Sequence, residues 1–479
     1  MIAKYLWVFA EKFSVNLIKL VTIIVLARLI TPNEFGVFAI AMYIITTCMV
    51  VVDSGMAGSL IKERNINNTD YSTVNYYNIF LSLFLIFLIY ILSDVVSKYY
   101  QNQDLALMLK FMSIFLLIRS FTIVHIVYLS KKMEFRKQTY VYAFSAIVGG
   151  LGAVILAWKN YGVWSLIAQQ MIELLSIYFI LRVMNSKFSY GYSFSIKTLK
   201  KHFNFGIKLT FSTILESLNN NIIINYIGKI GGINLVGQYS QMTKVNDIYL
   251  GVISSAVDKA ALPIFVRNLN NENNLLELTK KTLGFLGIFV YLGISILIIN
   301  SSLVVNILLG NNWVEYSWIL QILCLLGYMQ IVDTIVRSYL KAKDLPNIIL
   351  FNSLIKFLVF FVGMLLSYLF TNDVKFFVLM LVVWSLMYTV ISLINVWFNV
   401  ERRIFELVYS VFKPLLVSFL TILFFKNFYF YFESESLLND FFYFLLNCMV
   451  VSTLYFLLLF VFRVKEFFTI LDIIKRRLL

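Results

Sequence analysis

The chain alternates long apolar windows with short polar connections from end to end. Windows of about 20 residues match the length that a helix needs to cross a hydrocarbon layer of roughly 30 Å. Helices are expected, because membrane β-strands alternate polar and apolar residues and give a far weaker signal. The pattern predicts an all-α polytopic membrane protein with about fourteen spans, at residues 10–30, 36–61, 74–96, 105–129, 138–158, 162–183, 203–228, 236–262, 282–300, 316–340, 347–370, 376–399, 414–431 and 441–462. Because proline interrupts helices, all four prolines are expected in connections or at span ends: Pro32, Pro263, Pro346 and Pro414.

The composition excludes a soluble protein. Of the 479 residues, 60% are hydrophobic and 14% are charged, and the mean hydropathy is +0.84. A soluble chain averages about 25% charged residues. The three cysteines lie in apolar stretches and the two histidines are far apart, so no disulfide framework, metal site or catalytic histidine constellation is expected.

Most of the formal charge of +15 reflects how the chain is oriented in the membrane. In the connections that share a side with both termini there are 26 Lys and Arg, against five in the other connections. Lys and Arg collect in cytoplasmic loops, so both termini are expected in the cytoplasm. This account of the basic excess leaves no need for a nucleic-acid partner.

Apart from Glu11, Lys12, Asp94, Arg182 and Lys426, fifteen charged residues lie inside the predicted spans. Nine are basic: Lys19, Arg28, Lys110, Arg119, Lys208, Lys244, Lys259, Arg337 and Lys356. Six are acidic: Asp53, Glu173, Glu216, Asp247, Asp258 and Asp333. Each costs at least about 2.5–3.5 kcal/mol in hydrocarbon, so such groups face protein or a wet cavity. The basic excess favours an anionic ligand, while pairing that only fixes helix register remains the alternative.

Several of these residues recur every three or four positions and therefore share a helical face. The faces are Lys208, Ser212, Glu216 and Asn219/Asn220 in one span, Lys244, Asp247, Gly251 and Asp258 in the next, and Gln330, Asp333 and Arg337 in another. Such stripes predict a shared polar interior. Lys19 and Arg28 are nine residues apart and half a turn out of phase. Either the cavity is broad there, or one of the two faces another helix.

A weak internal repeat recurs at an offset of 201 residues. Its two copies join equivalent spans and consist of Arg28, Asn33, Gly36 and Phe38, matched by Lys229, Asn234, Gly237 and Tyr239. Six spans, an even number, separate the copies. The repeat therefore predicts two halves of parallel topology about a pseudo-two-fold axis along the membrane normal, with a substrate site between them.

Four segments carry a family resemblance: Leu26–Arg64, Lys131–Gln170, Val236–Ile248 and Ile307–Gly327. They resemble the bacterial O-antigen and polysaccharide flippases of the multidrug/oligosaccharidyl-lipid/polysaccharide exporter superfamily. The likeness covers roughly residues 1–370, and the C-terminal hundred residues match only in hydropathy.

The resemblance implies two six-helix lobes and two additional helices. The expected bounds are 1–183 for the first lobe, 184–202 for a cytoplasmic linker, 203–399 for the second lobe and 400–479 for the extra helices and tail. It also implies a bacterial inner-membrane protein that moves an undecaprenyl-pyrophosphate-linked oligosaccharide to the outer leaflet by alternating access. Expected partners are this lipid-linked sugar, the bilayer, and polymerase and chain-length components; no cofactor is expected.

Arginine and lysine are suited to a pyrophosphate, arginine through a planar bidentate fork and lysine through a point charge. The residues expected to bind substrate are Arg28, Arg119, Lys208, Lys19, Lys244, Asn220 and Gln330. Long cations near span ends can instead snorkel to the interface, as Lys19, Lys110 and Lys356 could. The candidates for proton or sodium coupling are Asp53, Glu216, Asp258 and Asp333, each with a structural alternative.

Three rival functions remain open: a polysaccharide polymerase or ligase, a multidrug exporter, and a lipid II exporter of the same superfamily. A polymerase needs a catalytic platform outside the membrane, and the longest outward connection, residues 301–315, contains no Lys, Arg or His. No glycine-rich loop followed by Lys-Ser/Thr is present, which argues against ATP hydrolysis. The sequence predicts a transporter and not an enzyme.

Overall fold

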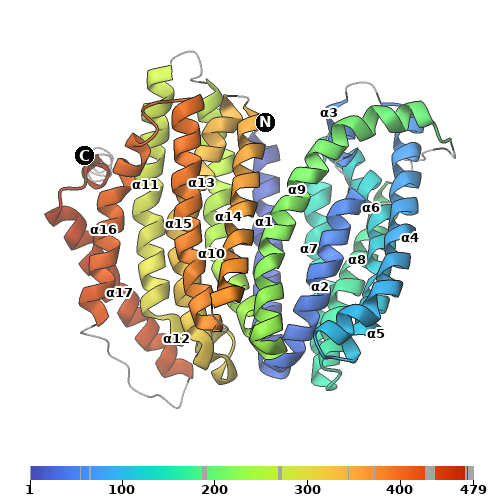
Figure 1. Cartoon of the computed structure of the whole chain (residues 1–479), viewed down its shortest axis with the longest axis horizontal. Helices are drawn as coiled ribbons and strands as arrows, with labels where there is room; N and C mark the ends of the chain where they lie inside the picture. Colours follow the sequence, from blue (N-terminus) through green and yellow to red (C-terminus); the bar gives the residue numbers. More distant parts are fainter. Residues whose placement is uncertain are drawn as a thin grey trace. The chain divides into compact units, whose positions relative to one another are not determined.

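In this computed structural model the chain is described at residues 2–53, 56–63, 66–185, 191, 193–267, 272–343, 345–370, 373–426, 437–469 and 472. These residues form helices and connections, with no strand among them (Figure 1). In chain order the helices are α1 (Ile2–Leu29), α2 (Pro32–Asp53), α3 (Met56–Lys62), α4 (Asn68–Tyr99), α5 (Asp104–Met112), α6 (Ile114–Lys131), α7 (Phe135–Trp158), α8 (Val163–Met184), α9 (Ile196–Ile230), α10 (Gly232–Arg267), α11 (Glu272–Ile299), α12 (Ser301–Leu308), the 3₁₀ helix η1 (Asn311–Tyr316), α13 (Ser317–Ala342), α14 (Pro346–Phe370), α15 (Val374–Asn399), α16 (Glu406–Lys426) and α17 (Leu437–Val461).

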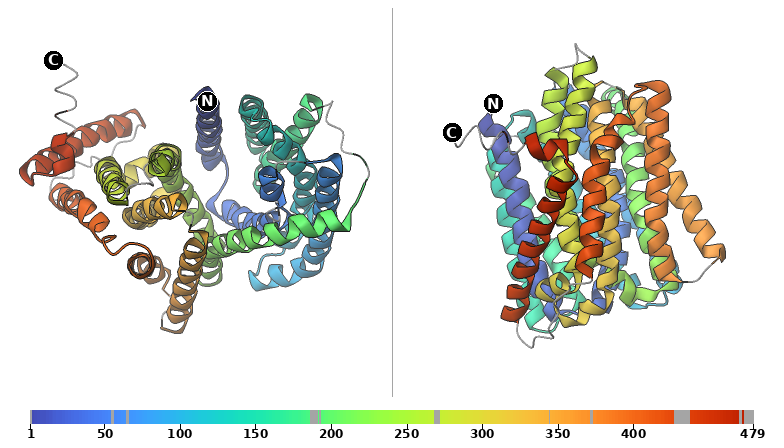
Figure 2. Two further views of the ribbon diagram at one scale, coloured as in Figure 1. Left: turned by 90° about the horizontal axis from the view of Figure 1, so that it is seen from above. Right: turned by 90° about the vertical axis from the view of Figure 1, so that its left-hand side faces the viewer.

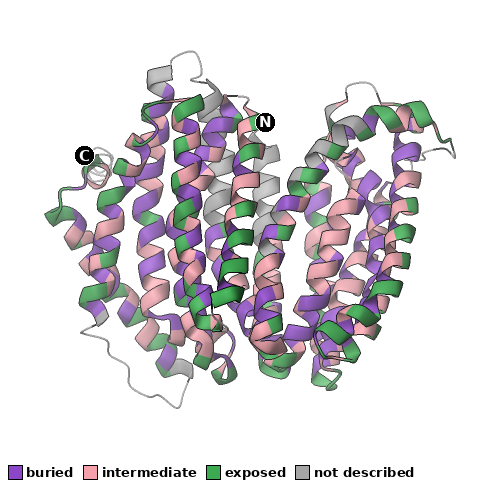
Figure 3. Ribbon diagram, viewed as in Figure 1, coloured by how far each residue is buried: buried purple, intermediate pink, exposed green. Residues whose placement is uncertain are grey.

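The predicted all-α membrane architecture is confirmed. Among the described residues, eleven candidate spans are long and apolar enough to cross a membrane. The long helices α1, α9 and α10 coincide with three further predicted windows, and parts of their side chains lie outside the described residues. The exact number of fourteen spans stays a prediction. Large apolar side chains are exposed along many of the helices, as expected where lipid is the solvent (Figure 3).

The predicted window at residues 105–129 matches the candidate span Asp104–Lys131, in which a turn at Ser113 separates α5 from α6. The start of another predicted window is wrong. The window predicted to start at Pro414 starts earlier, because α16 begins at Glu406 and contains that proline. Pro263 also lies inside a helix, near the end of α10. Proline is therefore not confined to span ends here, because membrane helices tolerate it where neighbours satisfy the freed backbone groups.

Two compact units divide the chain, Met1–Ser240 and Gln241–Leu479. They differ from the predicted lobes, whose bounds stay a prediction. In the first unit α7 packs against α1 and α8, and α4 packs against α5 and α6. Small residues allow the close approach of α7: a methyl group on Gly150 would lie 2.6 Å from the Thr22 hydroxyl of α1. The unit also contains α9, which bends along its length and contacts α2, α3 and α4 (Figures 1 and 2).

The two copies of the internal repeat lie against each other at the first turns of α2 and α10. Gly36 faces the carbonyl of Ile233, and Gly237 faces the carbonyl of Pro32. Pro32 and Ile233 are themselves 201 residues apart, as Gly36 and Gly237 are. Each contact is thus the repeat-equivalent of the other, which is the pattern that a local two-fold axis produces. We call this contact the glycine crossing.

The second unit is built around α11, which packs against α13, α16 and α17, while α14 packs against α15. One core cluster joins α11, α16 and α17 to the segment after α17, through Ile288, Val417, Tyr455, Leu459 and Val464. The two additional helices, α16 and α17, are therefore part of this unit's core. The predicted connection at residues 301–315 is largely helical, forming α12 and most of η1, and Trp313 in it is fully buried.

Candidate functional site

Two residues that the sequence placed in different roles form one ion pair in the first unit. Asp53, the last residue of α2, is a coupling candidate, and Arg119 of α6 is a phosphate-binding candidate. The guanidinium donates from Nε to Oδ1 at 3.3 Å and from Nη2 to Oδ2 at 3.1 Å. The side chains remain 27% exposed at Arg119 and 37% at Asp53. A carboxylate within a membrane span is costly when it is uncompensated, so the cation beside it is stabilising.

Two further cations in the first unit also have acidic partners. Lys19 of α1 lies 3.0 Å from Glu173 of α8, and Lys110 of α5 lies 3.0 Å from Asp94 of α4. The first pair shows that Lys19 faces another helix. This was one of the two explanations for why Lys19 and Arg28 lie half a turn out of phase. These pairs reduce the number of unpaired cations in the spans of this unit, so an anion site here depends on which pairs can open.

The remaining candidates of the first unit are described only in part. Arg28, at the end of α1, is exposed. The side chains of Lys208, Glu216 and Asn220 lie outside the described residues. Their neighbour Asn221 is buried and donates to the Thr47 hydroxyl of α2 at 2.8 Å. This amide therefore joins two helices.

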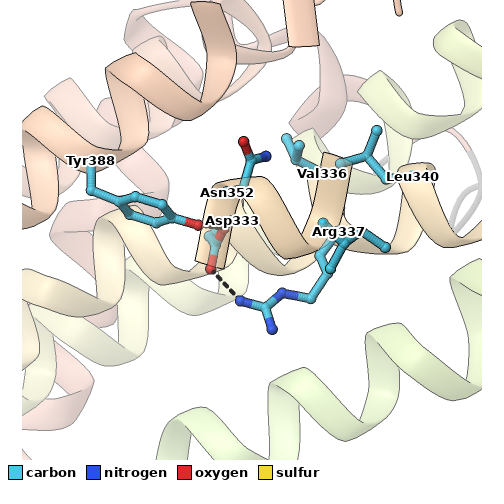
Figure 4. Close-up of a pocket in the computed structure, with 7 residues that line it drawn as sticks. Asp333, Val336, Arg337, Leu340, Asn352 and Tyr388 are labelled. Atoms are coloured by element: carbon cyan, nitrogen blue, oxygen red, sulfur yellow. Dashed lines mark hydrogen bonds and ion pairs between the residues drawn. The ribbon is translucent and has the colours of Figure 1, made fainter. Parts of the chain in front are cut away.

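In the second unit a small pocket with both polar and apolar lining residues lies among α13, α14 and α15 (Figure 4). Arg337 lies 3.3 Å from Asp333 one turn earlier, and the Tyr388 hydroxyl donates to the same carboxylate at 2.7 Å. Asn352 lines the pocket and donates to Ser392 at 3.0 Å. With an empty volume of about 210 Å³ that includes open solvent, the pocket can take an ion or water. An oligosaccharide is far larger.

The other candidates of this unit are dispersed. Gln330 is exposed, Lys244 is partly buried, and the side chain of Asp258 lies outside the described residues. The ammonium of Lys356 lies 5.3 Å from the ring centre of Tyr388. Among the described residues the structure therefore groups Asp333 with Arg337, as their spacing predicted, and adds Tyr388 and Asn352 from other helices.

One cluster was missed by sequence reasoning. His202 of α9 is fully buried, with Nδ1 2.8 Å from the Ser59 hydroxyl of α3 and Nε2 3.4 Å from Asp70 of α4. Next to it, Lys201 forms a 2.6 Å ion pair with Glu63. Over 130 residues separate His202 from both of its partners, so no local spacing pointed to the cluster. It fixes the start of α9 to α3 and α4.

We expect His202→Ala to lower the free energy of unfolding by about 2–3 kcal/mol. The substitution leaves a cavity and removes the partner of a buried carboxylate, and each effect is destabilising. Thermal unfolding of the purified protein measures the change. Lys200→Ala, which alters an exposed neighbour on the same helix, serves as the control. An unchanged midpoint for His202→Ala would contradict a role in fixing α9.

Comparison with known proteins gives the family. The family model described as "Polysaccharide biosynthesis protein" matches residues 25–318. The lipopolysaccharide biosynthesis protein WzxC of Escherichia coli (strain K12) is 24% identical over 329 residues, which cover 68% of this chain and 66% of that protein. The succinoglycan biosynthesis transport protein ExoT of Rhizobium meliloti (strain 1021) is 23% identical over 320 residues, covering 65% and 63%. The chain thus matches about two thirds of the length of these relatives.

A solved structure shows the fold. The lipid II flippase MurJ, in an inward closed conformation, matches with a TM-score of 0.72 and 15% identity, over 94% of this chain and 99% of that one. At this identity the likeness shows architecture alone. Because the family model covers more than half of the sequence, this chain belongs to the polysaccharide biosynthesis protein family, built on the fold seen in that flippase.

Proposed function

We propose that the protein is a flippase that moves an undecaprenyl-pyrophosphate-linked oligosaccharide from the cytoplasmic to the outer leaflet of the bacterial inner membrane. It works by alternating access and makes or breaks no covalent bond. Both termini lie in the cytoplasm, as the distribution of Lys and Arg favours. The lipid tail stays in the bilayer while the charged head group and sugars pass through the protein.

The observation that carries the proposal is Arg119. It lies inside the candidate span Asp104–Lys131 and yet keeps 27% of its side chain exposed. An arginine in a membrane span marks a substrate or ion pathway. Its guanidinium has five N–H donors in a planar fork that matches phosphate oxygens. A pyrophosphate between lipid and sugar is the part of the proposed substrate that such a group would hold.

The other predicted residues complete the proposal. Arg28, Lys208, Lys19 and Lys244 are further cations along the path, with Asn220 and Gln330 as sugar contacts. Glu216, Asp258 and Asp333 remain coupling candidates beside Asp53. The link of Asp333 to Arg337 and Tyr388 supports the choice, because a carboxylate held by a cation and a phenol can exchange one of them for an ion.

Genetic complementation tests the proposal. A strain that lacks its own polysaccharide flippase receives this chain, or the chain with Arg28, Arg119 or Lys208 changed to alanine. We expect the wild type to restore surface polysaccharide and the three variants to restore less at equal protein levels. If all three variants act normally, the cationic path is wrong even where the function is right.

The rival functions are separate outcomes of the same experiment. Rescue of a strain that lacks its lipid II exporter, without rescue of polysaccharide export, would assign the chain to peptidoglycan. Glycosyl transfer by the purified protein would make it a polymerase or ligase. Export of cationic drugs alone would place it with the multidrug transporters. Polysaccharide rescue without these activities supports the proposal.

A further inference from the structure

Arg119 and Asp53 occupy each other's hydrogen-bonding groups. Two of the five N–H donors of Arg119 are directed at Asp53, one from Nε and one from Nη2, in the side-on geometry that also suits two phosphate oxygens. The carboxylate thus occupies the face of the guanidinium that offers the best bidentate contact. An anion that takes this face must first displace Asp53.

Displacement leaves Asp53 without its cation. The residue lies within the candidate span Pro32–Ile61, where an uncompensated carboxylate costs several kcal/mol. A proton from solvent removes this cost, and the 37% exposure of the side chain gives solvent access.

Other charged and titratable groups lie near this pair. Tyr142 of α7 hydrogen-bonds to the guanidinium of Arg119, and Glu11 of α1 interacts electrostatically with Tyr142. On the helices that pack against α2, ion pairs among the described residues join Lys110 with Asp94, Glu173 with Lys19, Lys201 with Glu63, and His202 with Asp70, and Arg182 lies near His125. Lys208 and Glu216 of α9 have side chains outside the described residues.

We propose that Asp53 is an internal anion that holds Arg119 when substrate is absent, and that a phosphate group displaces it with uptake of a proton by Asp53. The inference rests on the proposed function, in which Arg119 holds the phosphate of the lipid-linked substrate. It adds a regulation of that site: anion binding and proton binding favour each other. By linkage the anion binds more tightly as pH falls, and the coupling is reciprocal.

Binding of inorganic pyrophosphate to the purified full-length protein tests the inference. Calorimetry in buffers of different ionisation enthalpy gives the number of protons taken up per anion bound. We expect the wild type to take up about one proton more than Asp53→Asn, which serves as the reference for titration of pyrophosphate itself. Asp53→Asn should bind about tenfold more tightly, at the lower end of typical coupling between sites. Arg119→Ala should lose binding.

Two further variants separate the pair from general charge effects. Asp94→Asn opens the pair with Lys110 on neighbouring helices, and it should change neither affinity nor proton uptake. Asp53→Glu keeps the carboxyl group and should retain proton uptake, which guards against a misfolded Asp53→Asn. Equal proton uptake in the wild type and Asp53→Asn, or no gain in affinity, overturns the inference, as does pyrophosphate binding that survives in Arg119→Ala.

These outcomes are independent of transport. If the chain fails to restore polysaccharide export while Asp53→Asn still shows tighter binding without proton uptake, the exchange stands and the proposed substrate is wrong. If export is restored while the wild type binds no pyrophosphate, the flippase stands and the exchange is wrong.

Discussion

Gly36→Ala and Gly237→Ala are each expected to abolish transport and to destabilise the first unit by about 3 kcal/mol. A methyl group on Gly36 would overlap the carbonyl of Ile233, and one on Gly237 would overlap the carbonyl of Pro32. The methyl group on Gly237 would also lie 2.9 Å from the backbone nitrogen of Gly36. These neighbours are backbone atoms, so α2 and α10 must move apart, and overpacking of this kind costs about 1–3 kcal/mol or more. Thermal unfolding and complementation measure the two effects.

Gly251→Ala is the matched control for this pair. It lies on α10 as well, is exposed, and would place its methyl group in open space. Since alanine favours a helix by about 1 kcal/mol over glycine, we expect an equal or slightly higher unfolding midpoint. If Gly36→Ala and Gly237→Ala behave like Gly251→Ala, the glycine crossing does not require close backbone contact.

Arg119→Ala is expected to reduce transport about 100-fold. The substitution removes both arms of a bidentate contact, and a hydrogen bond to a charged group contributes about 1.5–3 kcal/mol. Arg119→Lys keeps the charge without the fork, so an intermediate rate is expected. The rate at which lipid-linked sugar appears on the outer leaflet, normalised to the amount of folded protein, is the measurement.

Lys110→Ala controls for the loss of one positive charge near the same place. Lys110 lies in the same candidate span and also forms an ion pair, with Asp94. Its side chain is 32% exposed, similar to that of Arg119. We expect transport within about twofold of the wild type, because a partly exposed pair contributes little. Equal losses for the two variants would show that net charge, and not the guanidinium of Arg119, matters.

The fold could be read from hydropathy to a large extent, because a bilayer permits few spanning structures. Helix class and most windows follow from the apolar lengths alone. The start of α16 could not be read in this way, since Pro414 suggested an end where neighbouring helices accommodate a proline within the helix. The turn at Ser113, which separates α5 from α6, likewise has no counterpart in the hydropathy pattern.

The repeat was visible as a few similar residues, and the structure shows why glycine occurs in both copies. Gly36 and Gly237 each lie against a backbone carbonyl of the other copy. Sequence comparison could detect the shared offset of 201 residues. The contact between the two copies arises from the three-dimensional arrangement, so the spacing of residues along the chain could not predict it.

The candidate site was only partly predictable. The spacing of Asp333 and Arg337 within one helix sufficed to predict their pair, which the structure confirms. Lys19 and Glu173, or Arg119 and Asp53, lie on different helices, and a sequence shows the charges without their partners. The net charge counted from the sequence is unchanged by such pairing, but fewer cations are left to bind an anion, and the roles of the individual residues stay predictions.

Reconstitution tests the central claim most directly. The purified protein is placed in liposomes with undecaprenyl-pyrophosphate-linked oligosaccharide, and the fraction that a membrane-impermeant glycosidase can reach is followed in time. The account predicts that the protected fraction falls in liposomes with the wild type and falls about 100-fold more slowly with Arg119→Ala. A protected fraction that stays as constant with the folded wild type as in protein-free liposomes would contradict it.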